Sequence, residues 1–318
     1  MLPGRLALAA LLLLAASAAG AQERTVRVVS GFAAGGASDF VSRLVAEAVG
    51  PMLGARAVVE NRTGANGAIG AAEVARSAPD GGTVFQCPMS TLAIAPQLIG
   101  ASLPVDPGTA LQPIATVALS SYGFVVAADG PYRSVEDVLE AARQRPGQVT
   151  FASAGVGSAQ HLSGELLQQK TGLRMTHVPY RGATPAIVDI LGGRTDFMIT
   201  NLGDATRHIQ GGKLRLLAIA DDSRSPLFPE TPPLSRIVPG FDVTGWFGIC
   251  GPKGLSGEPL RRWEEALRAA LRDEAVVRRL ADNGLTPHFE DSATLARRLE
   301  NDRRTWLEVI RAVNVRAE

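Results

Sequence analysis

The sequence predicts a two-lobed α/β protein in which helices cover both faces of parallel sheets. Short apolar strands alternate with helical segments along most of the chain, as is typical of parallel sheets. A glycine-rich turn joins a strand to a helix once in each half, at residues 31–39 and 152–158. No repeat or low-complexity linker separates the halves. We therefore expect strands, rather than a flexible tether, to join the two lobes.

The composition restricts the classes of function. The 318 residues suffice for two ordinary domains, and 46% hydrophobic against 20% charged residues excludes a disordered chain. Lysine and arginine number 32 against 31 acidic residues, so no basic surface for nucleic acid or an anionic membrane is expected. Specificity must therefore come from local sites.

Residues 1–21 are expected to be a signal peptide. Arg5 gives a positive start, residues 6–16 are an unbroken Leu/Ala run, and Ala19 and Ala21 fit the small-residue cleavage rule, with Gln22 as the mature start. The run is too short for a membrane span, which needs about 20 apolar residues. A buried N-terminal helix is disfavoured because a fully apolar helix needs cover on all sides. We expect export to the periplasm, in a mature form that carries 31 basic and 31 acidic residues after Arg5 is removed.

The elements follow from local patterns. A helix is expected over 40–53, because Val41, Leu44, Val45 and Ala48 fall on one face, and a second over 67–75. Further strands and helices alternate to about residue 250. Strands are expected at 25–30, 57–60, 83–87, 114–118, 123–127, 149–152, 175–178, 197–200, 214–220 and 245–250.

Later helices carry clear end signals. Ser134 and Asp137 form a capping box that opens a helix over 135–143. Helices over 183–191 and 204–210 each end at a pair of glycines. Two amphipathic helices follow, with apolar faces marked by Leu260, Trp263, Leu267 and Leu271 and by Leu295, Leu299, Trp306 and Ile310. Acids interleave with the arginines of these helices, which indicates solvated faces rather than a phosphate patch.

The two cysteines exclude a disulfide scaffold and a four-cysteine zinc site. Cys87 and Cys250 each end a short apolar strand. An oxidising compartment would permit a disulfide between them. Two buried free thiols remain the alternative, because free cysteine is among the most buried residue types.

The two glycine-rich turns are the candidate binding elements. Glycines let the backbone turn sharply while the first N–H groups of the following helix stay unpaired, which makes an anion cradle without a charged side chain. Ser38 and Ser158 are expected as N-caps whether or not a ligand binds. One cradle in each half suggests a cleft that closes on a small molecule with a carboxylate at one or both ends.

Motifs for enzymes and metals are mostly absent. There is no nucleophile elbow and no P-loop, and the four histidines lack metal-ligand spacing. Gly31, Gly35, Gly36 and Glu60 resemble a loose dinucleotide fingerprint, which leaves an α/β enzyme as an alternative. The final glycine of that fingerprint is missing. We therefore expect a binding protein without catalysis, cofactor or metal.

A series of motifs carries a family resemblance. In order they are GGASD at 35–39, VVENR at 58–62, APDG at 78–81, SAGVGS at 153–158, HLSGEL at 161–166, HVPYRG at 177–182 and WFG at 246–248. In this order and spacing the chain resembles the Bug-type receptors, the solute-binding proteins of tripartite tricarboxylate transporters. The resemblance covers essentially the whole mature chain.

This resemblance implies a type II-like periplasmic binding fold with two crossover strands and a ligand cleft between the lobes. Lobe one would hold residues 24–120 and 245–318, and lobe two residues 121–244. The ligand would be a small carboxylate held by backbone N–H groups and hydroxyls of both lobes. The candidate ligand-binding residues are Phe32, Ala33, Ala34, Gly35, Gly36, Ser38, Ser90 and Thr91 in lobe one, and Ala154, Gly155, Gly157, Ser158, His161, Tyr180, Thr200, Asn201 and Asp204 in lobe two. The implied partner is a membrane permease of the same type or, alternatively, a membrane sensor, with the receptor a monomer.

The sequence departs from the family at three places. Ala33 and Ala34 replace a usual proline pair, and Thr200 replaces an aspartate commonly found before Asn201. Asp204, on the first turn of the next helix, is an added acid. The favoured interpretation is a helix N-terminal charge paired with Arg207. If Asp204 faces the ligand instead, an amino or hydroxyl group on that ligand becomes plausible.

Overall fold

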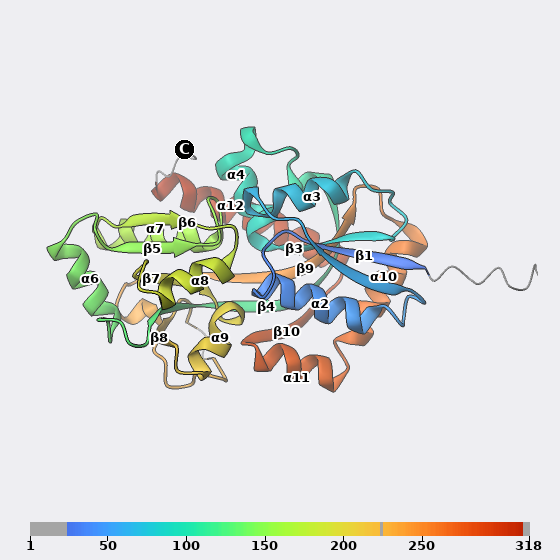
Figure 1. The fold of residues 1–318 in the computed structure, drawn as a ribbon. Coiled ribbons are helices and arrows are strands. Elements are labelled where there is room, and N and C mark those ends of the chain that lie inside the picture. Colours follow the sequence, from blue (N-terminus) through green and yellow to red (C-terminus); the bar gives the residue numbers. More distant parts are fainter. Residues whose placement is uncertain (1–23, 223–224, 314–318) are drawn as a thin grey trace, which may run out of the picture.

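The computed structural model describes residues 24–222 and 225–313 as a mixed α/β protein (Figure 1). Its strands form two groups that share β4 (Leu111–Ala127), and we call each group with its helices a lobe. The pairing order in lobe one is β2 (Arg56–Asn61), β1 (Thr25–Ser30), β3 (Thr83–Pro88), β9 (Thr244–Pro252), β4 and β10 (Leu285–Glu290). The lobe-two strands are β6 (Thr176–Pro179), β5 (Thr150–Ser153), β7 (Phe197–Asn201), β4 and β8 (Leu214–Ile219).

Strand β4 runs through both lobes (Figure 1). Its first part pairs antiparallel with β9, and from Tyr122 onward it pairs with β7 and β8. The chain returns from lobe two to lobe one at residue 243, one residue before β9 begins. There the Val243 N–H donates to the carbonyl of Ala220. The two lobes are therefore connected by extended backbone. These pairings support our proposal that lobe one comprises residues 24–120 and 245–318 and lobe two residues 121–244.

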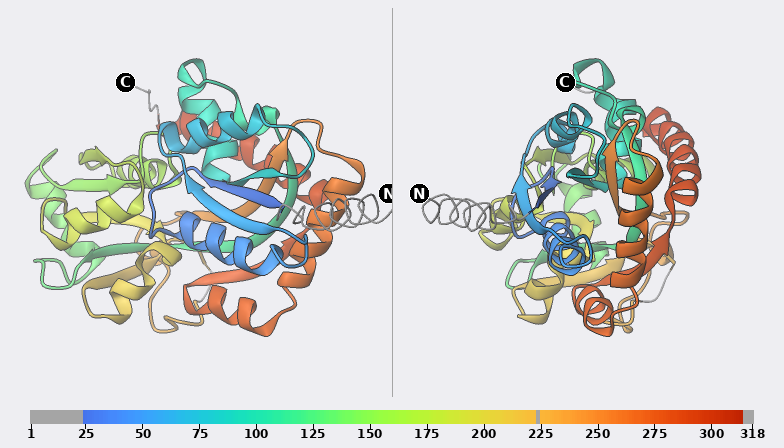
Figure 2. Two further views of the ribbon diagram at one scale, coloured as in Figure 1. Left: turned by 45° about the vertical axis from the view of Figure 1, so that its right-hand side comes forward. Right: turned by 90° about the vertical axis from the view of Figure 1, so that its right-hand side faces the viewer.

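The lobe-one sheet is covered on both faces because its strands are apolar on both sides. Val28 packs in a cluster with α2 (Ala37–Val49) and α10 (Gly257–Ala270), whereas its neighbour Val29 packs with α3 (Ala68–Ala75) and α12 (Ser292–Val313). Side chains that alternate along a strand point to opposite faces. Figure 2 shows α12, in red, running along the side of the molecule away from the blue N-terminal elements.

The apolar cluster around α12 continues into lobe two. It includes Phe124 of β4, Phe151 of β5 and Leu162 of α7 (Ala159–Thr171). The opposite face of the lobe-two sheet is covered by α8 (Ala183–Leu191) and α9 (Leu202–Gln210). The remaining helical segments are η1 (Ala65–Gly67), η2 (Ser90–Ile94), α4 (Ala95–Ile99), η3 (Gly100–Ser102), α5 (Pro107–Ala110), α6 (Val135–Gln144), η4 (Leu234–Arg236) and α11 (Glu274–Asp282).

Most elements expected from the sequence are present, although helix α9 begins two residues earlier than expected and α11 was not expected. Three further differences have a clear physical cause. The strands expected at 114–118 and 123–127 are one strand, because residues 119–121 stay extended against Thr244–Trp246 of β9. Helix α2 begins at Ala37 and ends at Val49, earlier than expected, since Gly36 is its N-cap and Pro51 disfavours further helix. Strand β10 was not expected; it contains Pro287, a residue that strands accept at edge positions such as this one.

Cys87 and Cys250 form a disulfide in the structure. They lie on β3 and β9, which are antiparallel neighbours, with their Cα atoms 5.9 Å apart. Of the two states that the sequence left open, the structure shows the bridge. It fastens the N-terminal strands of lobe one to a strand 163 residues further along the chain.

Among residues 24–222 and 225–313 there is no helix with the length and apolarity needed to cross a membrane. The signal peptide expected at residues 1–21 lies outside this described part of the chain.

Candidate ligand site between the lobes

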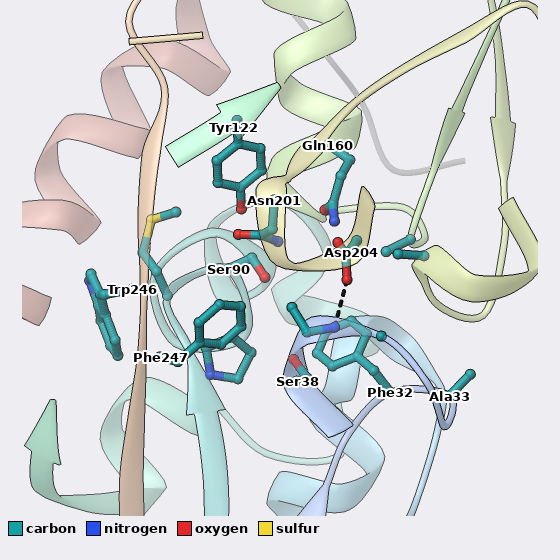
Figure 3. Close-up of a pocket in the computed structure, with 16 residues that line it drawn as sticks. Phe32, Ala33, Ser38, Ser90, Tyr122, Gln160, Asn201, Asp204, Trp246 and Phe247 are labelled. Carbon is teal, nitrogen blue, oxygen red and sulfur yellow. Dashed lines mark hydrogen bonds between the residues drawn. The ribbon is translucent and has the colours of Figure 1, made fainter. Parts of the chain in front are cut away.

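A cavity lies between the lobes and is lined by both of them (Figure 3). We call it the inner cavity; counted together with its open mouth, its empty space is about 460 Å³. Its lining residues are Phe32, Ala33, Gly36, Ala37, Ser38, Pro88, Met89, Ser90, Tyr122, Ala154, Gln160, Ala183, Asn201, Asp204, Trp246 and Phe247. The candidate residues brought together there are Phe32, Ala33, Gly36, Ser38, Ser90, Ala154, Asn201 and Asp204.

The N-terminus of α2 opens toward this cavity. Gly35 takes a positive φ of 89°, which only glycine adopts without strain, and Gly36 is the N-cap without a side chain to close the helix end. The predicted N-cap role of Ser38 is therefore wrong: Ser38 lies within the first turn and lines the cavity. This glycine-led turn leaves a helix N-terminus, with its positive dipole end, facing the cleft.

Asp39 holds the first turn of α2 in shape. Its carboxylate accepts hydrogen bonds from the Gly35 N–H at 3.0 Å, from Arg43 Nε at 2.9 Å and from Asn61 Nδ2 at 2.9 Å. Burial opposes ionisation, but the hydrogen bonds from Arg43, Gly35 and Asn61 outweigh it and lower the pKa of Asp39. Asn61 also donates to the carbonyl of Phe32 at 3.0 Å. The side chains of Asp39 and Asn61, which lie behind residues 32–36, therefore hold this part of the cavity wall in place.

Asp204 reaches across the cleft to this helix end. Its Oδ1 accepts the Ala37 N–H at 2.7 Å (Figure 3). Its Oδ2 accepts the Thr200 hydroxyl at 2.7 Å. The expected pairing with Arg207 is therefore wrong: Oδ1 is bonded to lobe one across the cleft, and Oδ2 is bonded to Thr200 within lobe two. Burial raises the pKa of Asp204 despite the hydrogen bonds that favour its charged form.

The lobe-two turn is folded as expected but does not face the inner cavity over its whole length. Ser158 accepts the His161 N–H at 3.1 Å, which confirms its role as an N-cap. Gly157 donates its N–H to His161 Nδ1 at 3.3 Å, and its carbonyl accepts Asn66 Nδ2 of lobe one at 2.7 Å. The turn is therefore stabilised by Gly157, Ser158 and His161. Gly157 also accepts a hydrogen bond that joins the two lobes.

His161 lies beneath the turn rather than in the cavity. Its ring is buried and stacks on His177, with ring centroids 3.9 Å apart. Burial lowers the pKa of His161 to about 4. Burial, together with His161, lowers the pKa of His177 to about 3. Both rings are therefore neutral at physiological pH, as expected of structural histidines.

Further candidate residues line a second cavity between the lobes, which we call the flanking cavity. Gly155 and Tyr180 lie there, and the cavity shares Phe32 and Ala154 with the inner cavity. The Tyr180 hydroxyl donates to Asp189 at 2.6 Å. The structure gives the remaining candidates structural hydrogen bonds: Thr91 donates to the Asn66 carbonyl at 2.8 Å, Thr200 donates to Asp204, and the Ala34 carbonyl accepts the Thr184 hydroxyl at 3.0 Å.

Several lining residues were not among the candidates, most notably Tyr122, Gln160, Trp246 and Phe247. Tyr122 lies on β4, and Trp246 and Phe247 lie on β9, so the crossover region itself forms one wall. Trp246 is fixed from behind by a hydrogen bond from its Nε1 to Asp302 at 2.6 Å. Trp246 and Phe247 belong to the WFG motif, which was the sequence signal that could have identified them.

Glu60, the acid of the loose dinucleotide fingerprint, is engaged elsewhere. Arg27 Nε lies 2.8 Å from its Oε1, and Arg62 Nη2 lies 2.8 Å from its Oε2. A ribose-binding acid must have a free carboxylate to accept the hydroxyls. In the part of the chain that the structure describes, no three His, Cys, Asp or Glu side chains are grouped as for a metal ion.

Comparisons with known proteins agree with this architecture. The model of the tripartite tricarboxylate transporter family receptor, TctC, matches residues 41–315. Protein BugT of Bordetella pertussis is 33% identical over 293 residues, which cover 91% of this chain and 89% of BugT. A solved R. palustris protein with adipate has a TM-score of 0.89 at 29% identity, over 93% of this chain and 99% of that one. MatC from Rhodopseudomonas palustris, with bound malate, has a TM-score of 0.84 at 28% identity, over 90% and 99%.

A two-lobed α/β fold with a cavity between its lobes defines a periplasmic-type solute-binding protein. The chain belongs to the TctC, or Bug, family of tripartite tricarboxylate transporter receptors. Proteins of this family are periplasmic solute-binding receptors rather than enzymes.

Proposed function

We propose that this protein captures a small carboxylate-bearing ligand in the inner cavity and delivers it to a membrane transporter of the tripartite tricarboxylate type. The observation that carries the proposal is the N-terminus of α2: Asp204 of lobe two takes its Ala37 N–H, and the next residue, Ser38, lines a cavity formed by both lobes. Such a helix end stabilises an anion through its N–H groups and dipole. The relatives solved with adipate and malate support a carboxylate ligand.

The mechanism is capture by closure, without a chemical step. The ligand binds to one lobe first, and closure then brings polar groups of the other lobe onto it. Excluding water strengthens each dipole contact because the effective dielectric constant falls. The closed shape is the state that a permease would select. We further propose that the chain acts as a monomer in the periplasm after residues 1–21 are removed.

The proposal is tested by isothermal titration and thermal shifts with mono-, di- and tricarboxylates. A ligand at about a hundredfold its Kd stabilises the fold by about 2.7 kcal/mol, which raises the Tm by a few degrees for a chain of this size. We expect one class of organic acid to give this shift and to be recovered unchanged. A shift with nucleotides and none with any acid would contradict the proposal.

A cavity-filling variant locates the binding event. Ala154→Leu projects a larger side chain from the wall that the two cavities share, and we expect it to weaken ligand binding at least tenfold. Ala296→Leu makes the same change on the exposed face of α12, and it should leave affinity unaltered. Ligand-free melts of both variants check that the fold is retained.

Delivery is tested separately, in the bacterium. Deleting the gene should abolish uptake of the identified ligand. Unchanged uptake together with a lost transcriptional response to the ligand would instead support a receptor that presents the ligand to a membrane sensor.

A further inference from the structure

The inner cavity carries an acidic side chain and no basic one. Of its sixteen lining residues, Asp204 is the sole carboxylate, and none is lysine, arginine or histidine. A ligand carboxylate placed beside Asp204 would meet a like charge in a site of low polarity, where repulsion is strong. The part of the ligand that lies beside Asp204 must therefore be neutral or positively charged.

Asp204 retains the capacity to accept another hydrogen bond. A carboxylate offers about four lone-pair positions. The Ala37 N–H and the Thr200 hydroxyl occupy one on each oxygen, and the side chain of Asn201 also contacts the group. One more donor can therefore be accommodated without breaking the contact between the lobes. Burial raises the pKa of this carboxyl group, and a nearby cation favours its ionised form.

Aromatic rings line the same cavity as this carboxylate. Phe32, Tyr122, Trp246 and Phe247 all line the same cavity. In Figure 3, Phe32 lies on the same side as Asp204, whereas Tyr122 and Phe247 lie across from it. Ring faces attract ammonium groups through their quadrupole. A cavity that holds a carboxylate and aromatic rings, and no basic side chain among its lining residues, has the chemistry to bind an amine.

Other polar residues of the cavity can bind a second group of an amine ligand. Ser38 in the first turn of α2 and Ser90 at the start of η2 line the cavity on the lobe-one side. Their hydroxyls can donate hydrogen bonds to a carboxylate. The lining thus separates a position for a cation from a position for an anion.

We propose that the ligand is an amino acid or a similar zwitterion, with its ammonium group on Asp204 and its carboxylate toward Ser38 and Ser90. This inference rests on the proposed capture of an organic acid in the inner cavity and names the class of acid. It makes Asp204 the residue that distinguishes an amino acid from the plain acid of the same length.

The test is titration calorimetry with matched pairs that differ by one amino group: succinate and aspartate, glutarate and glutamate, adipate and 2-aminoadipate. We expect the amino member of the preferred pair to bind at least tenfold more tightly. Asp204→Asn keeps the size of the side chain and an oxygen for the Ala37 N–H, so the fold should persist, as a ligand-free melt can check. This variant should weaken binding of the amino member by ten- to a hundredfold and change binding of the plain acid by less than threefold.

Asp129→Asn, at an exposed turn of lobe two, is the matched control and should change neither affinity. Tighter binding of the plain acid, or an amino preference that survives in Asp204→Asn, would overturn this inference and leave the proposed function intact. Binding of cadaverine, a diamine without a carboxylate, that is lost in Asp204→Asn would support the role of Asp204 and overturn carboxylate capture. Binding of no acid and no amine would overturn both.

Discussion

The role of Asp204 could be assigned only from the folded structure. In the sequence its nearest opposite charge is Arg207, three positions away, which is the spacing of a helical ion pair. In the structure its partner is the Ala37 N–H, 167 residues away. Side-chain roles that depend on contact between distant segments leave no local pattern. Ser158 is the counterexample, because its cap partner His161 is only three residues away.

The stacked histidines of lobe two predict a pH dependence of stability. Both have a folded-state pKa below the ordinary value, about 4 for His161 and about 3 for His177, chiefly because of burial. Between pH 6.5 and those values the unfolded chain binds more protons than the folded one, so these residues lower stability as the pH falls. Between pH 7 and pH 5 we expect the free energy of unfolding of His177→Phe to fall by about 2 kcal/mol less than that of the wild type.

Urea unfolding at the two pH values measures this difference. Glu165, 3.7 Å from His161, has a pKa raised by burial, so it increases stability as the pH falls and opposes the effect of the histidines. The pH dependence of each variant must therefore be compared with that of the wild type. His208→Gln, at the end of α9, is the control and should keep the wild-type dependence. An identical dependence in His177→Phe would contradict the buried neutral state of His177.

At the scale of elements, the sequence was most informative where the signal is local. The capping box of Ser134 and Asp137 is present, and the helix over 183–191 has the expected bounds. The division of β4 into two strands was wrong, because Leu119, Ser120 and Ser121 are held extended by β9 rather than by their own propensity. Strand β10 was also missed: it forms by pairing with β4 at the sheet edge, where Pro287 is tolerated.

The disulfide between β3 and β9 predicts sensitivity to reduction. It closes a loop of 163 residues, and cross-links over long loops stabilise a protein by restricting its unfolded state. We expect Cys87→Ala/Cys250→Ala to lower the free energy of unfolding by about 2–5 kcal/mol. Urea unfolding with and without reductant measures the loss. Reductant should destabilise the wild type and leave the double variant unchanged; equal midpoints in the wild type would contradict the prediction.

At the scale of the whole molecule, the lobes are in contact. Hydrogen bonds cross the cleft from Asn66 to the Gly157 carbonyl, from Thr184 to the Ala34 carbonyl and from Ala37 to Asp204. The order of motifs was enough to predict the two-lobed fold and the general position of the cleft. It could not predict these contacts, nor that Tyr122, Trp246 and Phe247 form a wall, because they arise from how the lobes close.

We expect Asn66→Gly to shift the ligand-free protein toward an open form. Asn66 adopts a positive φ of 49°, which glycine tolerates, and the substitution removes the donor to Gly157 at 2.7 Å. Small-angle scattering should show a larger radius of gyration that returns to the wild-type value with ligand. Affinity should fall several-fold, because the binding-competent closed state is less populated.

Asn301→Ala, on the exposed face of α12, is the control and should leave the radius unchanged. A wild-type radius in Asn66→Gly would show that this hydrogen bond does not hold the lobes together.

The position of β9 has a consequence for synthesis. Strand β9 lies between β3 and β4 in the sheet, although the chain that emerges from the ribosome delivers β1 to β3 first and β9 more than 150 residues later. Until residue 244 has appeared, β3 presents an open edge, and Trp246 and Phe247 are missing from the cavity wall. A prematurely terminated chain can therefore complete neither the lobe-one sheet nor the cavity, so ligand capture is restricted to molecules that have been made almost to the end.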